Sequence, residues 1–121
     1  MCDALGNPLR LAITPGQRAD CAEAEALLEG IASHALIADK GYDSDRLRDY
    51  CLQRRITPVI PSRRNRRMPQ VIDRNLYRDR NKIERLFNLF KHYRRVATRY
   101  DKTATSFLAF CHLAAAMILL R

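Results

Sequence analysis

Four side chains of the segment 77–91 have the types and the spacing needed for metal-dependent chemistry on a phosphodiester. They are Tyr77, Arg80, Glu84 and Lys91, at offsets of 3, 7 and 14 residues from the first. At about 100° per helical residue, these offsets place all four within roughly 60° of one another on a helix. A carboxylate can bind a divalent ion, and neighbouring cations can hold a DNA backbone in register. The alternative is that Glu84 only pairs with Arg80 or Arg85 and stabilises the helix.

A second acidic residue, Asp39, follows a short apolar run. The run occupies residues 35–38, and Gly41 comes two residues after the acid. Such a run is typical of a buried parallel strand. In open α/β sheets, ligands and metals gather at the C-terminal edge of the strands. We therefore expect Asp39 to lie at a ligand-binding edge.

The positive charge of the chain is concentrated in one stretch. The 121 residues contain 22 Lys and Arg against 13 Asp and Glu, a formal net charge of +9. Residues 54–95 hold fourteen of these cations and only three acids, which makes this stretch +11 and the rest slightly acidic. Most of the cations are arginines, whose guanidinium groups donate in pairs to phosphate oxygens. The pattern favours a nucleic acid over an anionic membrane as partner, with a merely solvated basic face as the alternative.

Further candidate DNA contacts lie in the segment 62–70. Its arginines are Arg63, Arg64, Arg66 and Arg67. The segment is polar and bounded by prolines, so we expect a loop that becomes ordered when it meets a phosphate backbone.

The first elements that must position these residues are a hairpin and a helix. We expect the hairpin over residues 1–15, with its turn at Gly6-Asn7-Pro8, a strand over 9–14 and its end at Pro15-Gly16. Asp20 can cap a helix through Leu28, and Gly30 follows where a helix stop is expected.

The segment 35–60 is expected to hold two central strands and the helix between them. Asp43 or Ser44 can cap that helix, which carries Leu47, Tyr50 and Cys51 on one face. The second strand is expected over residues 56–60, interrupted at Pro58.

The remainder predicts a basic loop over residues 61–72 and helices over 73–121. A long helix from about residue 73 to 96 is indicated by apolar residues at helical spacing, namely Leu76, Ile83, Leu86, Phe87 and Phe90. A turn at Tyr100-Asp101 separates it from an apolar terminal helix, 107–120, which is shorter than the ~20 residues of a membrane span. The whole chain, 1–121, is predicted to be one mixed α/β domain.

Cysteine and histidine are too scattered to indicate a structural zinc site. Cys2, Cys21, Cys51 and Cys111 form no close pair, and neither do the three histidines. Paired ligands a few residues apart are the usual pattern of such sites. We expect free thiols, no membrane association, and a bacterial cytoplasmic location.

Two motifs of this chain resemble one known family. The spacing from Tyr77 to Lys91 matches Y-(2)-R-(3)-E-(6)-K, the signature of a large group of DDE-type transposases of bacterial insertion sequences. The segment Ile37-Ala38-Asp39-Lys40-Gly41-Tyr42-Asp43-Ser44 is similar to the second-aspartate motif of that family. Residues 3–8 and 14–17 resemble its preceding hairpin, so the similarity covers nearly the whole chain.

The resemblance implies an RNase H-like fold, a mixed sheet with flanking helices. Asp39 would be the second acidic ligand and Glu84 the third, together holding two Mg²⁺ (or Mn²⁺) ions for in-line attack on DNA. Tyr77, Arg80 and Lys91 would contact the backbone of double-stranded transposon ends, on which the protein could also self-associate.

The chain departs from the family at the first catalytic aspartate. In the family that residue lies on a strand before the hairpin, and no residue here matches it. We therefore expect an incomplete RNase H-like fold that lacks this N-terminal strand, in a fragment that needs an upstream part for activity. Asp3 is a weak substitute, and Asp20, Asp43 and Asp45 are expected only to cap helices.

Other functions remain open at this stage. The same basic stripe would serve a catalytically inactive DNA-binding remnant or regulator of transposition. A basic RNA-binding protein is a weaker alternative, because the chain has no signature of an RNA-binding module.

Overall fold

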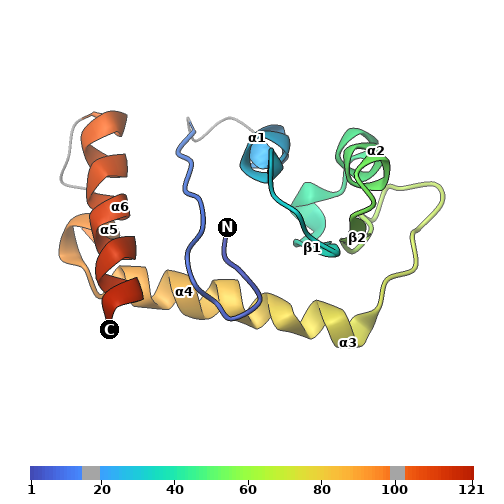
Figure 1. Ribbon diagram of the computed structural model, residues 1–121. Helices are drawn as coiled ribbons and strands as arrows, with labels where there is room; N and C mark the ends of the chain where they lie inside the picture. The colour runs from blue at the N-terminus through green and yellow to red at the C-terminus, as the bar shows by residue number, and fades with distance from the viewer. Residues whose placement is uncertain (15–19, 99–102) are drawn as a thin grey trace. The chain divides into compact units, whose positions relative to one another are not determined.

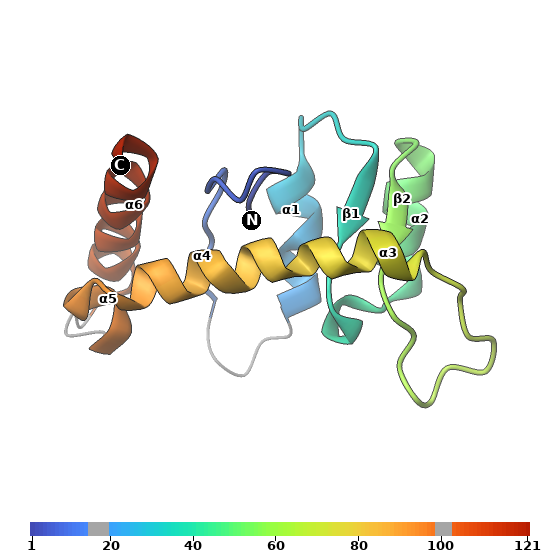
Figure 2. The same cartoon turned by 90° about the horizontal axis from the view of Figure 1, so that it is seen from below.

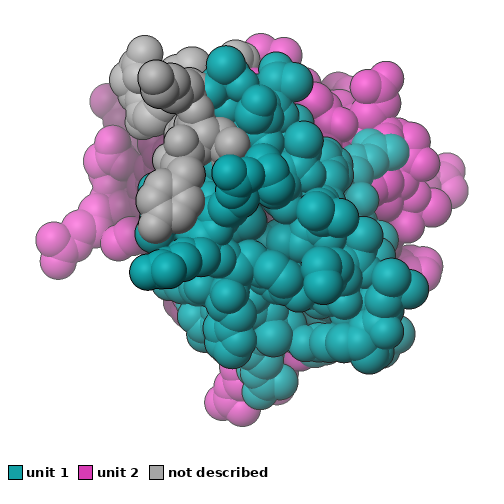
Figure 3. Space-filling view, turned by 90° about the vertical axis from the view of Figure 1, so that its left-hand side faces the viewer, with its two compact units in different colours: residues 1–13, 81–121 teal, residues 14–80 magenta. Residues whose placement is uncertain are grey.

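The computed structural model describes residues 1–14, 20–98 and 103–121. They divide into two compact units. One comprises Met1–Ile13 and Asn81–Arg121, and the other comprises Thr14–Arg80. Figure 1 shows the elements in chain order, and Figure 3 colours the two units.

The Thr14–Arg80 unit is built on two short parallel strands. A 3₁₀-helix, η1 (Asp20–Glu23), leads into α1 (Ala24–Leu28). Gly30 follows with a φ of 74°, the left-handed conformation that ends helices without a steric cost to glycine. The strands β1 (Ala35–Ile37) and β2 (Thr57–Val59) pair in register from Ala35 opposite Thr57 to Ile37 opposite Val59.

Along the chain, β1 is followed by η2 (Lys40–Tyr42) and α2 (Asp45–Gln53) before β2 begins. Of the two possible caps of α2, the structure uses Ser44, whose hydroxyl accepts the N–H of Leu47. Leu47 and Cys51 are spaced one helical turn apart, and both are buried with Val59 where α2 packs against β2 (Figure 2). β2 in turn pairs with β1, and Asp39 follows shortly after the C-terminal end of β1.

The rest of this unit carries the basic loop. Residues 60–73 form neither helix nor strand, as expected for 61–72. Asp73 then caps α3 (Arg74–Tyr77) by accepting the N–H groups of Asn75 and Leu76. A 3₁₀ segment, η3 (Arg78–Arg80), follows directly.

The other unit combines the N-terminal turn with the last three helices. Cys2 and Pro8 form an antiparallel bridge around a turn that Asp3 stabilises by accepting the N–H groups of Leu5 and Asn7. The helices are α4 (Asn81–Lys91), α5 (Arg94–Thr98) and α6 (Ala104–Leu120).

The core of this unit lies between α4 and α6. Its buried members are Leu86, Phe90, Ala114, Ala115 and Ile118. Cys2 and Leu11 of the N-terminal segment pack against them. No helix in the described part of the chain is long and apolar enough to cross a membrane.

The mixed α/β prediction is confirmed, with two corrections. The strand expected over residues 9–14 does not form. The isolated bridge joins Cys2 to Pro8, and beyond it the N–H of Leu9 donates to the Met1 carbonyl and the amino terminus donates to the Arg10 carbonyl. The long helix does not reach residue 96: the N–H groups of His92 and Tyr93 bond three residues back, which ends α4 at Lys91.

Packing explains that second correction. The turn at residues 92–93 brings Tyr93 and Val96 against the core, whereas Phe87, expected on the apolar face, is 57% exposed. The hairpin end at Pro15-Gly16, the turn at Tyr100-Asp101 and the side chain of Asp20 lie outside the described residues.

Candidate functional site

An open groove of about 750 Å³ in the Thr14–Arg80 unit brings together residues of both sequence motifs and the basic loop. Its charged and aromatic lining residues are Asp39, Lys40, Arg63, Arg64, Arg74, Tyr77 and Arg80. A volume of this size is in the range of ligand-binding sites. One carboxylate among four arginines and a tyrosine gives the groove a net positive charge, which suits a phosphate-bearing ligand.

Asp39 stands where a parallel strand ends. Its backbone is extended, with φ −78° and ψ 175°, and it forms the N-cap of η2. The Oδ1 atom accepts the N–H of Gly41 at 2.9 Å. Among the described residues, none donates a hydrogen bond to Oδ2, and the side chain is exposed. The carboxylate is thus held on one side and open on the other.

Tyr77 and Arg80 lie together in the same groove. The guanidinium carbon of Arg80 is 5.8 Å from the centre of the Tyr77 ring, within the range of a cation–π contact. These two members of the helical stripe therefore share a site with Asp39.

The other two members of the stripe, Glu84 and Lys91, belong to α4 and so to the other unit. Both are exposed. The 60° estimate assumed one α-helix throughout, but residues 78–80 are 3₁₀-helical and turn by about 120° each. That Asp39 and Glu84 converge on one metal ion stays a prediction.

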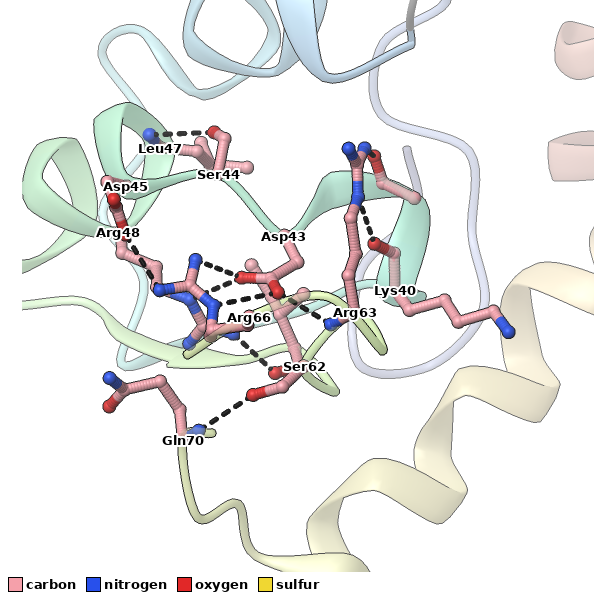
Figure 4. A network of polar contacts seen from close by, with 12 residues as sticks. Lys40, Asp43, Ser44, Asp45, Leu47, Arg48, Ser62, Arg63, Arg66 and Gln70 are labelled. Atoms are coloured by element: carbon pink, nitrogen blue, oxygen red, sulfur yellow. Dashed lines mark hydrogen bonds and ion pairs between the residues drawn. The ribbon is translucent and has the colours of Figure 1, made fainter. Parts of the chain in front are cut away.

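A buried carboxylate next to the groove was missed by the sequence analysis. The side chain of Asp43 is 1% exposed and accepts hydrogen bonds on both oxygens (Figure 4). Oδ1 accepts from Arg48 at 2.9 Å and from Arg66 at 2.6 Å. Oδ2 accepts from the backbone N–H of Arg63 at 2.7 Å and from Arg66 at 2.9 Å. We call Asp43, Arg48, Arg63 and Arg66 the Asp43 clamp.

The electrostatics of the Asp43 clamp are dominated by its hydrogen bonds. Burial alone would raise the pKa of Asp43, but donation from Arg66, the Arg63 N–H and Arg48 outweighs burial and holds the pKa well below its usual range. The expectation that Asp43 only caps a helix is therefore wrong. Arg48 lies five residues after Asp43 in the helix that follows, so its spacing could have suggested this ion pair. Nothing in the sequence indicates the pairing of Asp43 with Arg66.

The arginines of the basic loop differ in their surroundings. Arg66 directs Nε and Nη2 to Asp43 and Nη1 to Asp45, at 2.8 Å. Arg63 donates to the backbone carbonyls of Lys40 and Gly41. Arg64 and Arg67 are exposed, and Arg64 lines the groove.

Asp39 suits a divalent ion, because carboxylate oxygens are the protein ligands that Mg²⁺ prefers. Within the described residues, no group of three or more His, Cys, Asp or Glu side chains is close enough to hold a metal ion. Among the described residues that line the groove, Asp39 is the one carboxylate.

Comparison with known proteins finds a family and two relatives that are all described as transposases. Residues 36–121 match the sequence model of the family described as "Transposase DDE domain". The "Putative transposase for insertion sequence element IS6501" of Brucella ovis is 45% identical over 121 residues, which cover 98% of this chain and 93% of the relative. A protein of Burkholderia cepacia named in the same way for IS402 is 30% identical over 128 residues, covering 96% of this chain and 58% of that protein. No solved structure matches the chain.

Proposed function

Because the chain belongs to the transposase DDE domain family, we propose that it cuts and joins DNA at the ends of a bacterial insertion sequence. Double-stranded DNA would be the substrate and partner, and the bacterial cytoplasm the place of action. The proposed fold is RNase H-like, with β1, β2 and α2 as one part of it. Self-association on the DNA stays a prediction.

One arrangement carries the proposal. The Asp39 carboxylate lies in the same groove as Tyr77 and Arg80. These two residues belong to the motif that runs from Tyr77 to Lys91, some forty residues later in the chain. Arginines hold a phosphate backbone by charge and by paired hydrogen bonds. A carboxylate in such surroundings is placed to bring a divalent ion to a phosphate.

The residues present fit a divalent metal in part. Asp39 and Glu84 would hold two Mg²⁺ (or Mn²⁺) ions together with a first acidic ligand, which neither motif assigns. When bound, the ions stabilise charge on the attacking and leaving oxygens of the phosphodiester. The ions also offset the repulsion between carboxylates that share a site.

The remaining side chains would bind and orient the DNA. Tyr77 and Arg80 would contact the backbone beside Asp39, and Lys91 on α4 would add a further phosphate contact. Arg64 and Arg67 would extend the contact along the basic loop. Arg66 is already bonded to two carboxylates, so we assign it to the fold rather than to DNA.

A transposition assay tests this proposal. A marked copy of the insertion sequence is mobilised in bacteria with Asp39→Asn or Glu84→Gln in the coding sequence. Because bound metal ions lower the free energy of the transition state by several kcal/mol, the transposition frequency of each variant should fall about 1000-fold. The purified variants should still bind end DNA. Asp49→Asn, at an exposed carboxylate of α2 outside the groove, is the matched control. Transposition by Glu84→Gln at the original frequency would remove Glu84 from the mechanism.

A DNA-binding regulator that does not cut is the second candidate. The groove supports this candidate because its four arginines and its tyrosine could bind a phosphate backbone without any metal. In that case Asp39→Asn would leave both DNA binding and its effect on transposition unchanged.

A further inference from the structure

We propose that Arg63 is a positioning residue that orients the carboxylate of Asp39, and that Asp43 holds Arg63 in place. The inference rests on the proposed function, since it names what orients a metal ligand of that site. It also gives Arg63 another role than the DNA contact expected from its place in the basic loop.

The backbone of Arg63 is anchored by Asp43. Its backbone N–H donates to Oδ2 of Asp43 at 2.7 Å. Asp43 cannot swing away, because Arg48 and Arg66 hold its oxygens and its side chain is 1% exposed. A buried carboxylate with four charge-assisted or backbone donors is a rigid anchor. The start of the basic loop is thereby fixed relative to α2.

The side chain of Arg63 binds the turn that follows Asp39. The guanidinium group of Arg63 donates to the carbonyl of Gly41 at 2.8 Å and to that of Lys40 at 3.2 Å. Figure 4 shows this side chain reaching from the basic loop to the turn at Lys40. Two carbonyls of η2 are therefore held by one planar group.

The same turn holds the carboxylate of Asp39. The N–H of Gly41 donates to Oδ1 of Asp39, and the N–H of Tyr42 donates to the Asp39 carbonyl. The Lys40–Gly41 peptide group thus donates to the Asp39 side chain through its N–H and accepts from Arg63 through its carbonyl. Because Gly41 is held, Oδ1 of Asp39 is fixed, and the position of Oδ1 then determines the direction in which Oδ2 points.

The chemistry of these bonds requires arginine. Its guanidinium group has donors in a fixed planar fork, which can serve two carbonyls at once, whereas a lysine ammonium is a point charge on a flexible chain. Arg63→Lys therefore keeps the positive charge that DNA would attract but loses the two-carbonyl bridge. These bonds are exposed, so their loss should change the fold little.

Backbone dynamics of the full chain test the positioning role without any metal. In ¹⁵N relaxation, the order parameter of Gly41 should fall from a rigid value of about 0.85 to below about 0.6 in Arg63→Lys. The matched control is Arg46→Lys, because Arg46 also makes two exposed guanidinium bonds, to Glu25, in the same unit. An unchanged Gly41 in Arg63→Lys, or an equal fall in the control, would overturn the proposal.

Binding of Mn²⁺, followed by the loss of its free-ion magnetic resonance signal, separates this inference from the proposed function. We expect Asp39→Asn to abolish binding and Arg63→Lys to weaken it about tenfold, as loss of an outer partner of a metal ligand does. Equal binding by Asp39→Asn and the original chain would refute the metal site, while the order parameter of Gly41 still decides the positioning role. Equal Mn²⁺ affinity in Arg63→Lys, when Asp39→Asn has lost binding, would refute positioning.

Discussion

Gly41 shows how closely the backbone approaches the proposed metal ligand. A Cβ atom built on Gly41 would lie 2.9 Å from Oδ1 of Asp39, closer than such atoms approach in proteins. The φ of Gly41 is not in the left-handed region, in contrast to that of Gly30. A Cβ atom at this position would therefore disturb the side chain of Asp39 and not the backbone.

Substitution of these two glycines should give opposite results. Gly41→Ala should displace the Asp39 carboxylate and weaken Mn²⁺ binding about tenfold or more, at little cost to stability, since only the end of a side chain must move. Gly30→Ala should lower the free energy of unfolding by about 1–2 kcal/mol, because alanine is strained at a φ of 74°. It should leave Mn²⁺ binding unchanged. Urea unfolding and Mn²⁺ titration of both variants provide the test, and unaltered Mn²⁺ affinity in Gly41→Ala would contradict the close approach.

Residues near a strand end were easier to predict than residues held by distant partners. The position of Asp39 after β1 followed from an apolar run and a glycine. The burial of Asp43 did not follow, because two of its donors, on Arg63 and Arg66, lie twenty or more residues away in a loop without any periodicity. Loop contacts of that kind depend on the tertiary fold.

At the scale of elements, the Asp43 clamp connects α2 to the basic loop. Arg48 on α2 donates to both Asp43 and the carbonyl of Ile60, directly after β2. The loop that follows β2 is thus tied to the helix that precedes it. This explains how a segment without helix or strand can present its arginines in a defined arrangement.

Two neighbouring aspartates allow a matched test of the Asp43 clamp. Asp43→Asn should lower the free energy of unfolding by about 3 kcal/mol, because Arg48 and Arg66 lose a buried counter-charge. Asp45→Asn also removes a partner of Arg66, but the Asp45 side chain is 83% exposed, so it should cost less than about 1 kcal/mol. Urea unfolding of both variants measures the difference. Equal losses of unfolding free energy would show that the Asp43 clamp stabilises the fold no more than a surface ion pair does.

The same aspartate should make stability depend on pH. The pKa of Asp43 lies below its usual range in the folded chain, so the unfolded chain binds the proton first as the pH falls. The stabilisation is present above the unfolded pKa, about 3.9, and is lost as the pH falls below it. The original chain should therefore lose stability more steeply than Asp43→Asn between about pH 5 and pH 2. Parallel curves for the two proteins would contradict the assigned pKa direction.

Helix boundaries were the part of the element pattern that the sequence predicted least well. The apolar spacing predicted one helix from about residue 73 to 96. In the structure residues 78–80 are 3₁₀-helical, and the chain turns at 92–93, where Tyr93 and Val96 pack against the core. Ser44 and Asp43 were equally good caps by type, and only the fold separates them.

At the scale of the whole molecule, the basic charge spans both compact units. The boundary between them falls after Arg80, inside the motif that runs from Tyr77 to Lys91. No change in composition marks that boundary, so it could not be predicted from the sequence. The mixed α/β class could be, because it depends on patterns within each segment.

The dependence of DNA binding on salt should distinguish arginines that contact phosphate from those that hold the fold. Arg64→Ala should reduce the slope of log K against log salt by about 0.9, the value of one released counterion. Arg66→Ala should leave the slope unchanged and lower the urea midpoint, because Arg66 donates to Asp43 and Asp45. Fluorescence anisotropy over a range of salt concentrations measures both slopes. A larger change of slope for Arg66 than for Arg64 would reverse the assignment.

The most direct test of a metal ion shared by Asp39 and Glu84 is cleavage of the chain itself by bound iron. Fe²⁺ placed in the site with ascorbate and peroxide cuts the polypeptide at the residues closest to the ion, and mass spectrometry locates the cuts. We expect cuts beside both Asp39 and Glu84, suppressed by excess Mg²⁺ and absent in Asp39→Asn. Cuts beside only one of the two, or at neither, would contradict a common metal site.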